Sequence, residues 1–377
     1  MQEGNCSDSS LPRTELAAEE LISQTFDLPA ASTDRASLAI KVILQSRFHG
    51  ATVALSPIVC QDVISAVISA GCRPLFVDLD PSTTQVPASE WERARDDGAT
   101  IAIVVHLFGL GRSLSDVRRV FAGDGCLVID DAAQAVGTKI GNQYAGTFGD
   151  VGLLSFGYSK QLPMGGAAVL TRDDALLNLI RRNRLSASAT NGVSPQEEEF
   201  RKKLDQARVQ LAQRGRQAAS EFQGLLEGYE ESLNVAAPAN AAQLITESLP
   251  QLGEFRDKRM RKLLLWKRLL TGSGAEFFES PDGTNPWRAI FRLPGIGWED
   301  QATLADEIRS DGVPLSTWYL PGHWFLDGGD TVMDGAEQLS REVFQLWIDE
   351  VTTERQIRSW APSVKKVLQS FARRRAT

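Results

Sequence analysis

The sequence predicts an α/β protein with a larger domain on a mainly parallel sheet and a smaller C-terminal α+β domain. Short, uniformly apolar runs alternate with helical patterns through the first half of the chain. This is typical of strands buried on both faces and separated by helices. The second half has long helical stretches and few strand patterns, which indicates a separate, smaller unit. We therefore assign residues 1–245 to the large domain and residues 246–377 to the small one.

The predicted strands of the large domain are short and rich in aliphatic residues. Each is too uniformly apolar for a strand with one face in solvent. The expected strands are residues 52–55, 75–77, 101–105, 127–129, 153–156 and 167–170. The expected helices are residues 35–45, 61–70, 113–121 and 174–182.

The second half of the chain begins with an amphipathic helical pattern over residues 195–226, in which Gly215 is a possible break. A second helical stretch covers residues 239–270 and is expected to break near Pro250. The small domain should then contain two strands and two helices. We expect strands at 288–293 and 313–318, and helices at 302–310 and 353–371.

Composition narrows the class of protein. The chain has 377 residues, of which 42% are hydrophobic and 23% charged, as in a soluble globular protein. The net charge of −8 (40 basic minus 48 acidic residues) argues against nucleic acid as the main partner. No metal-like cysteine cluster is evident. The polar residues 1–12 and the lack of an apolar run of about 18 residues predict a cytoplasmic protein without a membrane partner.

Two acidic residues, Asp130 and Asp131, follow the predicted strand at residues 127–129. Carboxylates at the end of a buried strand are costly unless they have partners. In open α/β sheets, ligands bind beyond the carboxyl ends of the strands, so this pair is a candidate site. Capping the N-terminus of a following helix is the alternative, and the sequence leaves both open.

A lysine follows the next predicted strand. Lys160 lies 29 residues after Asp131 (160 − 131) in a segment with few other charges. Desolvation there would lower the pKa of its amine and suit it to Schiff-base chemistry. A lysine paired with an aspartate is what pyridoxal 5′-phosphate (PLP) requires, because the aspartate keeps the pyridine nitrogen protonated. Ser155 is a candidate donor to the phosphate.

The same segments resemble a known family. They look like the DegT/DnrJ/StrS aminotransferases, fold-type-I PLP enzymes best known for amino sugar biosynthesis on nucleotide sugars. The resemblance covers roughly residues 30–360 and implies a seven-stranded type of sheet, a small-molecule substrate, an amino donor and a homodimer with shared active sites. The motifs that carry it are VIDDAAQA at 128–135, AGTFGDVGLLSF at 145–156, Lys160 with Gly165 and Gly166, PLFVDLDP at 74–81 and HLFG at 106–109.

The resemblance implies a role for each matching residue. Lys160 would be the Schiff-base lysine, and Asp131 the partner of the pyridine nitrogen. Gln134 would lie near the O3′ atom of the cofactor, and Ser155 would bind its phosphate. Asn234 occupies the place of an asparagine that reaches the phosphate of the neighbouring subunit.

The chain also departs from the family pattern. Asp34 and Arg35 replace a Gly-Thr pair that donates backbone N–H groups to the phosphate, so Arg35 is expected to act as a charged clamp. Gln61 stands where an aromatic residue usually stacks on the pyridine ring, and Ala236 and Ala237 replace an Arg and a Met. The alternative hypothesis is therefore a PLP-fold protein with non-transaminating chemistry, or a catalytically degenerate partner subunit.

Other polar and aromatic residues have weaker signals. His106 is interpreted as structural rather than catalytic. Trp318-Tyr319 and His323-Trp324 either line the substrate pocket or belong to the core.

Overall fold

The computed structural model describes residues 12–184 and 195–376. Its larger sheet has seven strands in the order β1-β9-β8-β5-β4-β2-β3. Strands β3, β2, β4, β5 and β8 are parallel, whereas β9 runs antiparallel to β8 and to β1. The mainly parallel seven-stranded sheet is thus confirmed. The strands are β1 Ala30–Thr33, β2 Thr52–Leu55, β3 Arg73–Phe76, β4 Ala99–Val105, β5 Leu127–Asp131, β8 Val151–Ser155 and β9 Ala167–Leu170.

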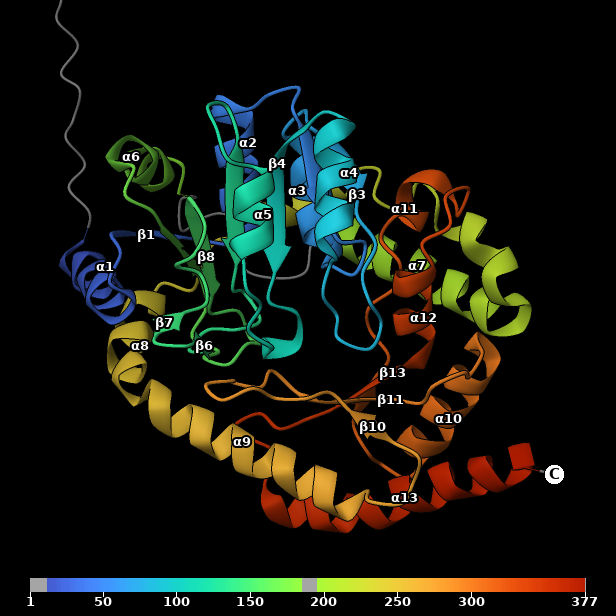
Figure 1. The fold of residues 1–377 in the computed structure, drawn as a ribbon. Helices are drawn as coiled ribbons and strands as arrows, with labels where there is room; N and C mark the ends of the chain where they lie inside the picture. Colours follow the sequence, from blue (N-terminus) through green and yellow to red (C-terminus); the bar gives the residue numbers. More distant parts are fainter. Residues whose placement is uncertain (1–11, 185–194, 377) are drawn as a thin grey trace, which may run out of the picture.

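Helices cover both faces of this sheet (Figure 1). Strand β4 shows why, because its side chains alternate between two apolar cores. Ile101 and Ile103 pack with the helices of one face, whereas Ala102 and Val104 pack with those of the other. The first face carries α2 (Ala36–Arg47), α3 (Gln61–Ser69) and α6 (Asp174–Arg182), and the second carries α4 (Ala88–Asp96) and α5 (Ser115–Val120).

A second, four-stranded antiparallel sheet follows in the order β10-β11-β13-β12. Figure 1 shows α9 and α13 running along the outer side of this sheet. Its strands are β10 Glu276–Phe277, β11 Ala289–Arg292, β12 Leu315–Ser316 and β13 Val343–Leu346. The helices packed around it are α9 Leu252–Leu269, α10 Trp298–Ser310 and α13 Glu354–Ala376, whereas α12 Asp334–Glu342 packs with the core of the large sheet.

Both expected helix breaks are confirmed. Helix α7 (Pro195–Arg214) ends at Gly215, whose φ of +58° is a left-handed conformation that glycine adopts readily. A short turn that contains Pro250 separates α8 (Ala241–Ser248) from α9. The remaining elements are α1 Arg13–Phe26, η1 Leu107–Gly109, β6 Lys139–Ile140, β7 Gln143–Tyr144, η2 Gly215–Phe222, η3 Tyr229–Leu233, η4 Leu249–Gln251 and α11 Trp324–Asp327.

The division into two domains near residue 245 stays a prediction.

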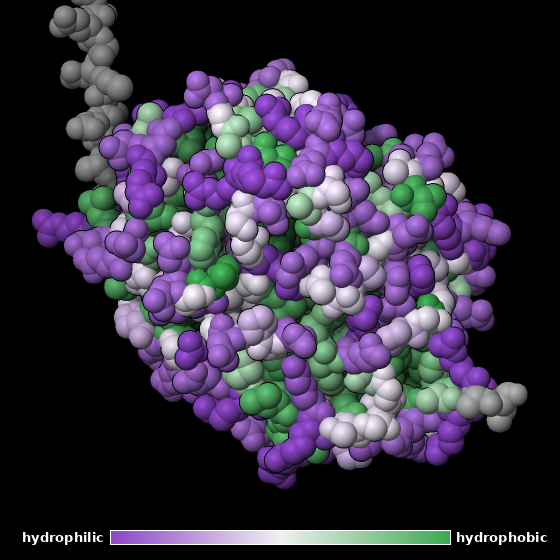
Figure 2. Space-filling model, in the orientation of Figure 1, coloured by the Kyte–Doolittle hydropathy of each residue, from purple (hydrophilic) through white to green (hydrophobic). Residues whose placement is uncertain are grey.

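Within residues 12–184 and 195–376, no helix is long and apolar enough to cross a membrane. The face shown in Figure 2 is mostly hydrophilic, and its hydrophobic residues gather in small, separate patches.

Candidate active site

Three of the predicted site residues lie at one edge of the large sheet. Strands β5 and β8 are parallel neighbours in which Asp131 is paired with Leu153. Strand β5 ends at Asp131, β8 ends at Ser155, and Lys160 follows five residues later in the chain. Because parallel strands end at the same edge, the topology brings Asp131, Ser155 and Lys160 to the same end of the sheet.

Lys160 is half-buried, and its amine is held among other side chains. Burial lowers the pKa of its amine, and the nearby Cys60 and Asp131 oppose that shift only in part. Its Nζ lies 5.7 Å from the centre of the Trp287 ring. Arg259 donates a hydrogen bond of 3.3 Å to its backbone carbonyl, which fixes the segment. The amine is therefore shifted toward its neutral, nucleophilic form.

Asp131 is 3% exposed and accepts a 2.8 Å hydrogen bond from the backbone N–H of Ala133. Burial raises the pKa of its carboxyl group, and Ala133 and Lys160 oppose the shift. No helix follows β5, since the chain continues through turns to β6. The helix-capping alternative is therefore wrong for both aspartates.

Asp130 is fully buried and has a different role. One carboxylate oxygen accepts a 2.6 Å hydrogen bond from Nε2 of His106, and the other accepts from the backbone N–H groups of Gly146 and Phe148, both at 2.9 Å. The backbone N–H of Arg112 donates to Nδ1 of His106, so the ring proton lies on Nε2. His106 and Asp130 thus tie the loop before β8 to the end of β4, in agreement with a structural His106.

Gln134 joins the two sheets. It is 3% exposed, its Oε1 accepts a 3.0 Å hydrogen bond from the backbone N–H of Phe108, and its Nε2 donates a 2.8 Å hydrogen bond to the hydroxyl of Tyr319. Burial raises the pKa of Tyr319 well above its ordinary value, so this phenol stays protonated. The Tyr319 ring stacks on Trp287 at 6.4 Å between ring centres. Tyr319 therefore belongs to the site.

Arg35 lies in a partly buried polar network, with its side chain 32% exposed. Its Nη2 forms a 2.7 Å ion pair with Asp62, and its Nη1 donates to the carbonyl of Ser232 at 2.9 Å. Burial lowers the pKa of Arg35, but Asp62, Cys60, Tyr229 and Glu197 together outweigh burial, so the pKa is raised. The Tyr229 hydroxyl donates to the same carboxylate at 2.8 Å, and Gln61 donates to that hydroxyl at 3.1 Å. The Gln61 side chain is thus engaged with Tyr229.

Three further residues were expected to lie near the phosphate of the cofactor. The Ser155 hydroxyl accepts a hydrogen bond of 3.4 Å from the backbone N–H of Gly157. The Asp34 carboxylate accepts one of 2.9 Å from the backbone N–H of Ala237. Asn234 follows η3 and is half-buried, and its role toward a second subunit stays a prediction.

The remaining aromatic residues were expected either to line the substrate pocket or to belong to the core. His323 and Trp324 are 1% and 0% exposed, and Trp324 packs against Phe222 in the core. The sequence had left Tyr319 open, and it gave no sign of Trp287, Asp62 or Tyr229 as neighbours of the site. These contacts arise from elements far apart in the chain, so no local pattern could have revealed them.

Comparison with known proteins agrees with this geometry. Residues 29–359 match the model of the DegT/DnrJ/EryC1/StrS aminotransferase family. The chain is 25% identical over 309 residues to a UDP-N-acetyl-3-dehydro-alpha-D-glucosamine 3-aminotransferase of Acidithiobacillus ferrooxidans, covering 80% of this chain and 74% of that protein. It is 27% identical over 303 residues to the L-glutamine:2-deoxy-scyllo-inosose aminotransferase of Streptomyces kanamyceticus, covering 77% of this chain and 65% of the relative, just under two thirds.

Solved structures share the fold. DesI in the presence of its TDP-sugar product superposes with a TM-score of 0.74 at 17% identity, covering 98% of this chain and 88% of DesI. The aminotransferase TlmJ from Streptoalloteichus hindustanus gives 0.73 at 18% identity, covering 96% and 92%. None of these matches supports the alternative of a non-transaminating or degenerate protein. The chain therefore belongs to the DegT/DnrJ/EryC1/StrS aminotransferase family.

Proposed function

We propose that this aminotransferase uses PLP to transfer an amino group to the keto group of a nucleotide-linked sugar. The observation that carries the proposal is that Lys160, whose amine pKa is lowered, lies at the same sheet edge as the buried Asp131. The relatives support the substrate class, since one is named for a UDP-linked keto sugar and another was solved with a TDP-sugar.

The residues present fit the cofactor at its reactive end. A neutral lysine amine is the group that condenses with an aldehyde, and a buried carboxylate is the group that holds a protonated ring nitrogen. Lys160 would carry the cofactor, Asp131 would hold its ring nitrogen, and Gln134 would lie beside its ring oxygen. Ser155 and Arg35 would bind the phosphate, with Asp62 setting the position of Arg35.

Bound PLP supplies an electron sink for the carbon that gains or loses the amino group. The chain supplies the proton movements and the surroundings. With PLP bound, the carboxylate of Asp131 would hold the proton on the ring nitrogen, and the ε-amine of Lys160 would move the proton at the reacting carbon. Trp287, whose ring centre lies 5.7 Å from Nζ of Lys160, borders the amine, and Tyr319 stacks on Trp287 at 6.4 Å.

The assembly that would complete the site is a homodimer in which Asn234 serves the phosphate of the partner subunit. A cytoplasmic location fits a nucleotide-sugar substrate. Both remain part of the proposal.

The test is amino transfer itself. The full chain, saturated with PLP, is supplied with L-glutamate or L-glutamine and a set of nucleotide-linked keto sugars, and the amino sugar is measured by mass spectrometry. We expect product from the parent and from Lys139→Ala, a lysine on β6 that stacks on Tyr144, and none from Lys160→Ala. Product from Lys160→Ala at the parental rate would contradict the proposal.

A further inference from the structure

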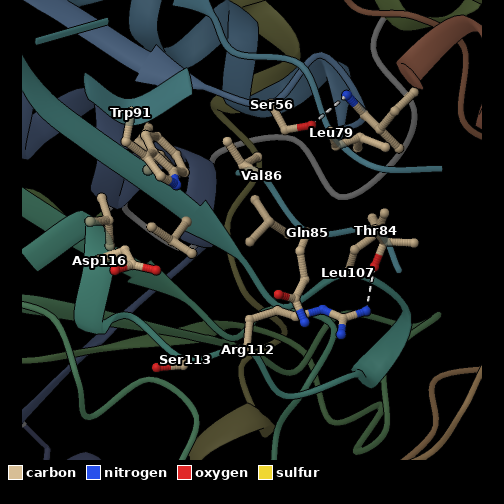
Figure 3. Close-up of a pocket in the computed structure, with 15 residues that line it drawn as sticks. Ser56, Leu79, Thr84, Gln85, Val86, Trp91, Leu107, Arg112, Ser113 and Asp116 are labelled. Carbon is tan, nitrogen blue, oxygen red and sulfur yellow. Dashed lines mark hydrogen bonds between the residues drawn. The ribbon is translucent and has the colours of Figure 1, made fainter. Parts of the chain in front are cut away.

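A second pocket lies outside the Lys160 site. It has a volume of about 100 Å³ and lies where β2 and β4 end, with walls from α4, α5 and the segment before α4 (Figure 3). None of the residues proposed above to hold the cofactor lines it. The pocket therefore needs its own explanation.

The topology predisposes this place to bind a ligand. Strand β2 leads through α3 to β3 at the edge of the sheet, whereas its neighbour β4 leads through α5 to β5 in the opposite direction. The helices after β2 and β4 consequently lie on opposite faces, which opens a crevice beyond the two strand ends. In open α/β sheets, ligands bind in such a crevice.

The pocket has both polar and apolar walls, and nine of the fifteen residues that line it are apolar. Trp91, Val86, Val117 and Ile103 line it together with the ends of β2 and β4. Figure 3 shows Trp91 and Val86 on the opposite side of the view from Arg112. An apolar cavity of about 150 Å³ accepts benzene, so about 100 Å³ suits an aliphatic group of roughly three or four carbons.

One charged side chain, Arg112, lines the polar end. Its Nη2 donates hydrogen bonds to the carbonyl of Thr83 and the hydroxyl of Thr84, and Figure 3 shows the latter. Its Nε is buried without a hydrogen-bond partner in the described chain. Among residues 12–184 and 195–376, Arg112 also has no acidic side chain within 4.0 Å. Arg112 as a whole is half-buried, but its buried Nε is left without a partner, so the geometry suits an anionic ligand.

The charges around Arg112 are compatible with an anion. Burial lowers the pKa of Arg112 to about 10, and Asp80 opposes the shift, so the guanidinium is charged at neutral pH. Asp116 also lines the pocket, but its side chain is 63% exposed and lies 3.9 Å from Arg119, so solvent screens its charge.

We propose that this pocket binds a small organic carboxylate, with the carboxylate on Arg112 and an aliphatic tail of three or four carbons against Trp91, Val86 and Val117. The site goes beyond the proposed transamination and does not depend on it. It is linked to the Lys160 site through the pairing of Val105, which lines the pocket, with Asp131, and through the backbone N–H of Arg112, which donates to His106 at 2.9 Å.

The test is calorimetric binding to the full chain saturated with PLP. The probes are butyrate, which has both the charge and the tail, acetate, which has the charge alone, and butyramide, which has the tail alone. We expect butyrate to bind at least roughly tenfold more tightly than either of the others, because a charge-assisted hydrogen bond and buried CH₂ groups each contribute on that scale.

Variants distinguish butyrate binding in the pocket from binding elsewhere on the protein surface. Arg112→Gln should weaken butyrate binding at least tenfold, whereas Arg358→Gln, an exposed arginine on α13 outside the pocket, should leave it unchanged. Val86→Phe fills the pocket from its partly exposed loop and should also abolish binding, which keeps the test valid if Arg112→Gln does not fold. No butyrate binding to the parent, or equal binding of butyrate and acetate, would overturn the proposal. Undiminished binding in folded Arg112→Gln or Val86→Phe would also overturn it.

Discussion

The adjacent aspartates at the end of β5 should respond in opposite ways to replacement by asparagine. Asp130 accepts hydrogen bonds from His106, Gly146 and Phe148, all donors. In Asp130→Asn, the new NH₂ group must face at least one of these donors. Losing one or two charge-assisted hydrogen bonds should cost about 2–5 kcal/mol in the free energy of unfolding. At roughly 2 °C per kcal/mol, the melting temperature should fall by about 4–10 °C.

Asp131→Asn should preserve stability and abolish function. Burial raises the pKa of Asp131, so its charge is costly in the fold, and an asparagine oxygen can still accept the hydrogen bond from Ala133. We expect the free energy of unfolding to change by less than about 1 kcal/mol. Turnover should fall by roughly a hundredfold or more, because the ring nitrogen loses the group that holds its proton.

Two measurements distinguish the aspartates. Thermal unfolding followed by circular dichroism at pH 7, without added PLP, reports stability, and amino transfer at saturating PLP reports function. The reasoning is refuted if both variants lose the same stability, or if Asp131→Asn keeps a turnover close to that of the parent.

Three further predictions concern the charges around the cofactor. Because burial lowers the pKa of Lys160 below 10.5, its stability contribution is lost as pH falls through the folded pKa. Lys160→Met should therefore raise the melting temperature more at pH 7 than at pH 10, and an equal effect at both would refute this. Arg35→Ala should weaken PLP binding roughly tenfold in a spectroscopic titration, while Asp62→Asn, which frees Arg35, should not weaken it. Mixed dimers of Lys160→Ala and Asn234→Ala should regain activity, and verified mixed dimers without activity would indicate self-contained sites.

The strands of the large sheet could be predicted because continuous apolar runs report burial on both faces. Residues 52–55 and 167–170 were placed as the structure has them. Strand β1 was missed because its sequence, Ala-Ala-Ser-Thr, has little β propensity, and it forms only through pairing with β9. Helix α4 was missed because it is short and polar and buries only Trp91 and Ala94.

At the site too, residues with a local sequence signal could be predicted, and contacts between distant parts of the chain could not. Asp131 and Lys160 could be predicted because each follows a buried strand, where a charged group is conspicuous. Tyr319 lies 185 residues from Gln134 in the chain, and the contact forms only when the second sheet packs on the first. The pairing of Arg35 with Asp62 likewise depends on the packing of α3 beside α2, which no local spacing encodes.

The assignment of Lys160 can be tested most directly by chemical labelling. The full chain is saturated with PLP, reduced with borohydride, digested and mapped by mass spectrometry. We predict a pyridoxyl group on Lys160, because burial lowers the pKa of this amine next to the buried Asp131. A label on a different lysine, or no label in PLP-saturated protein, would contradict the assignment.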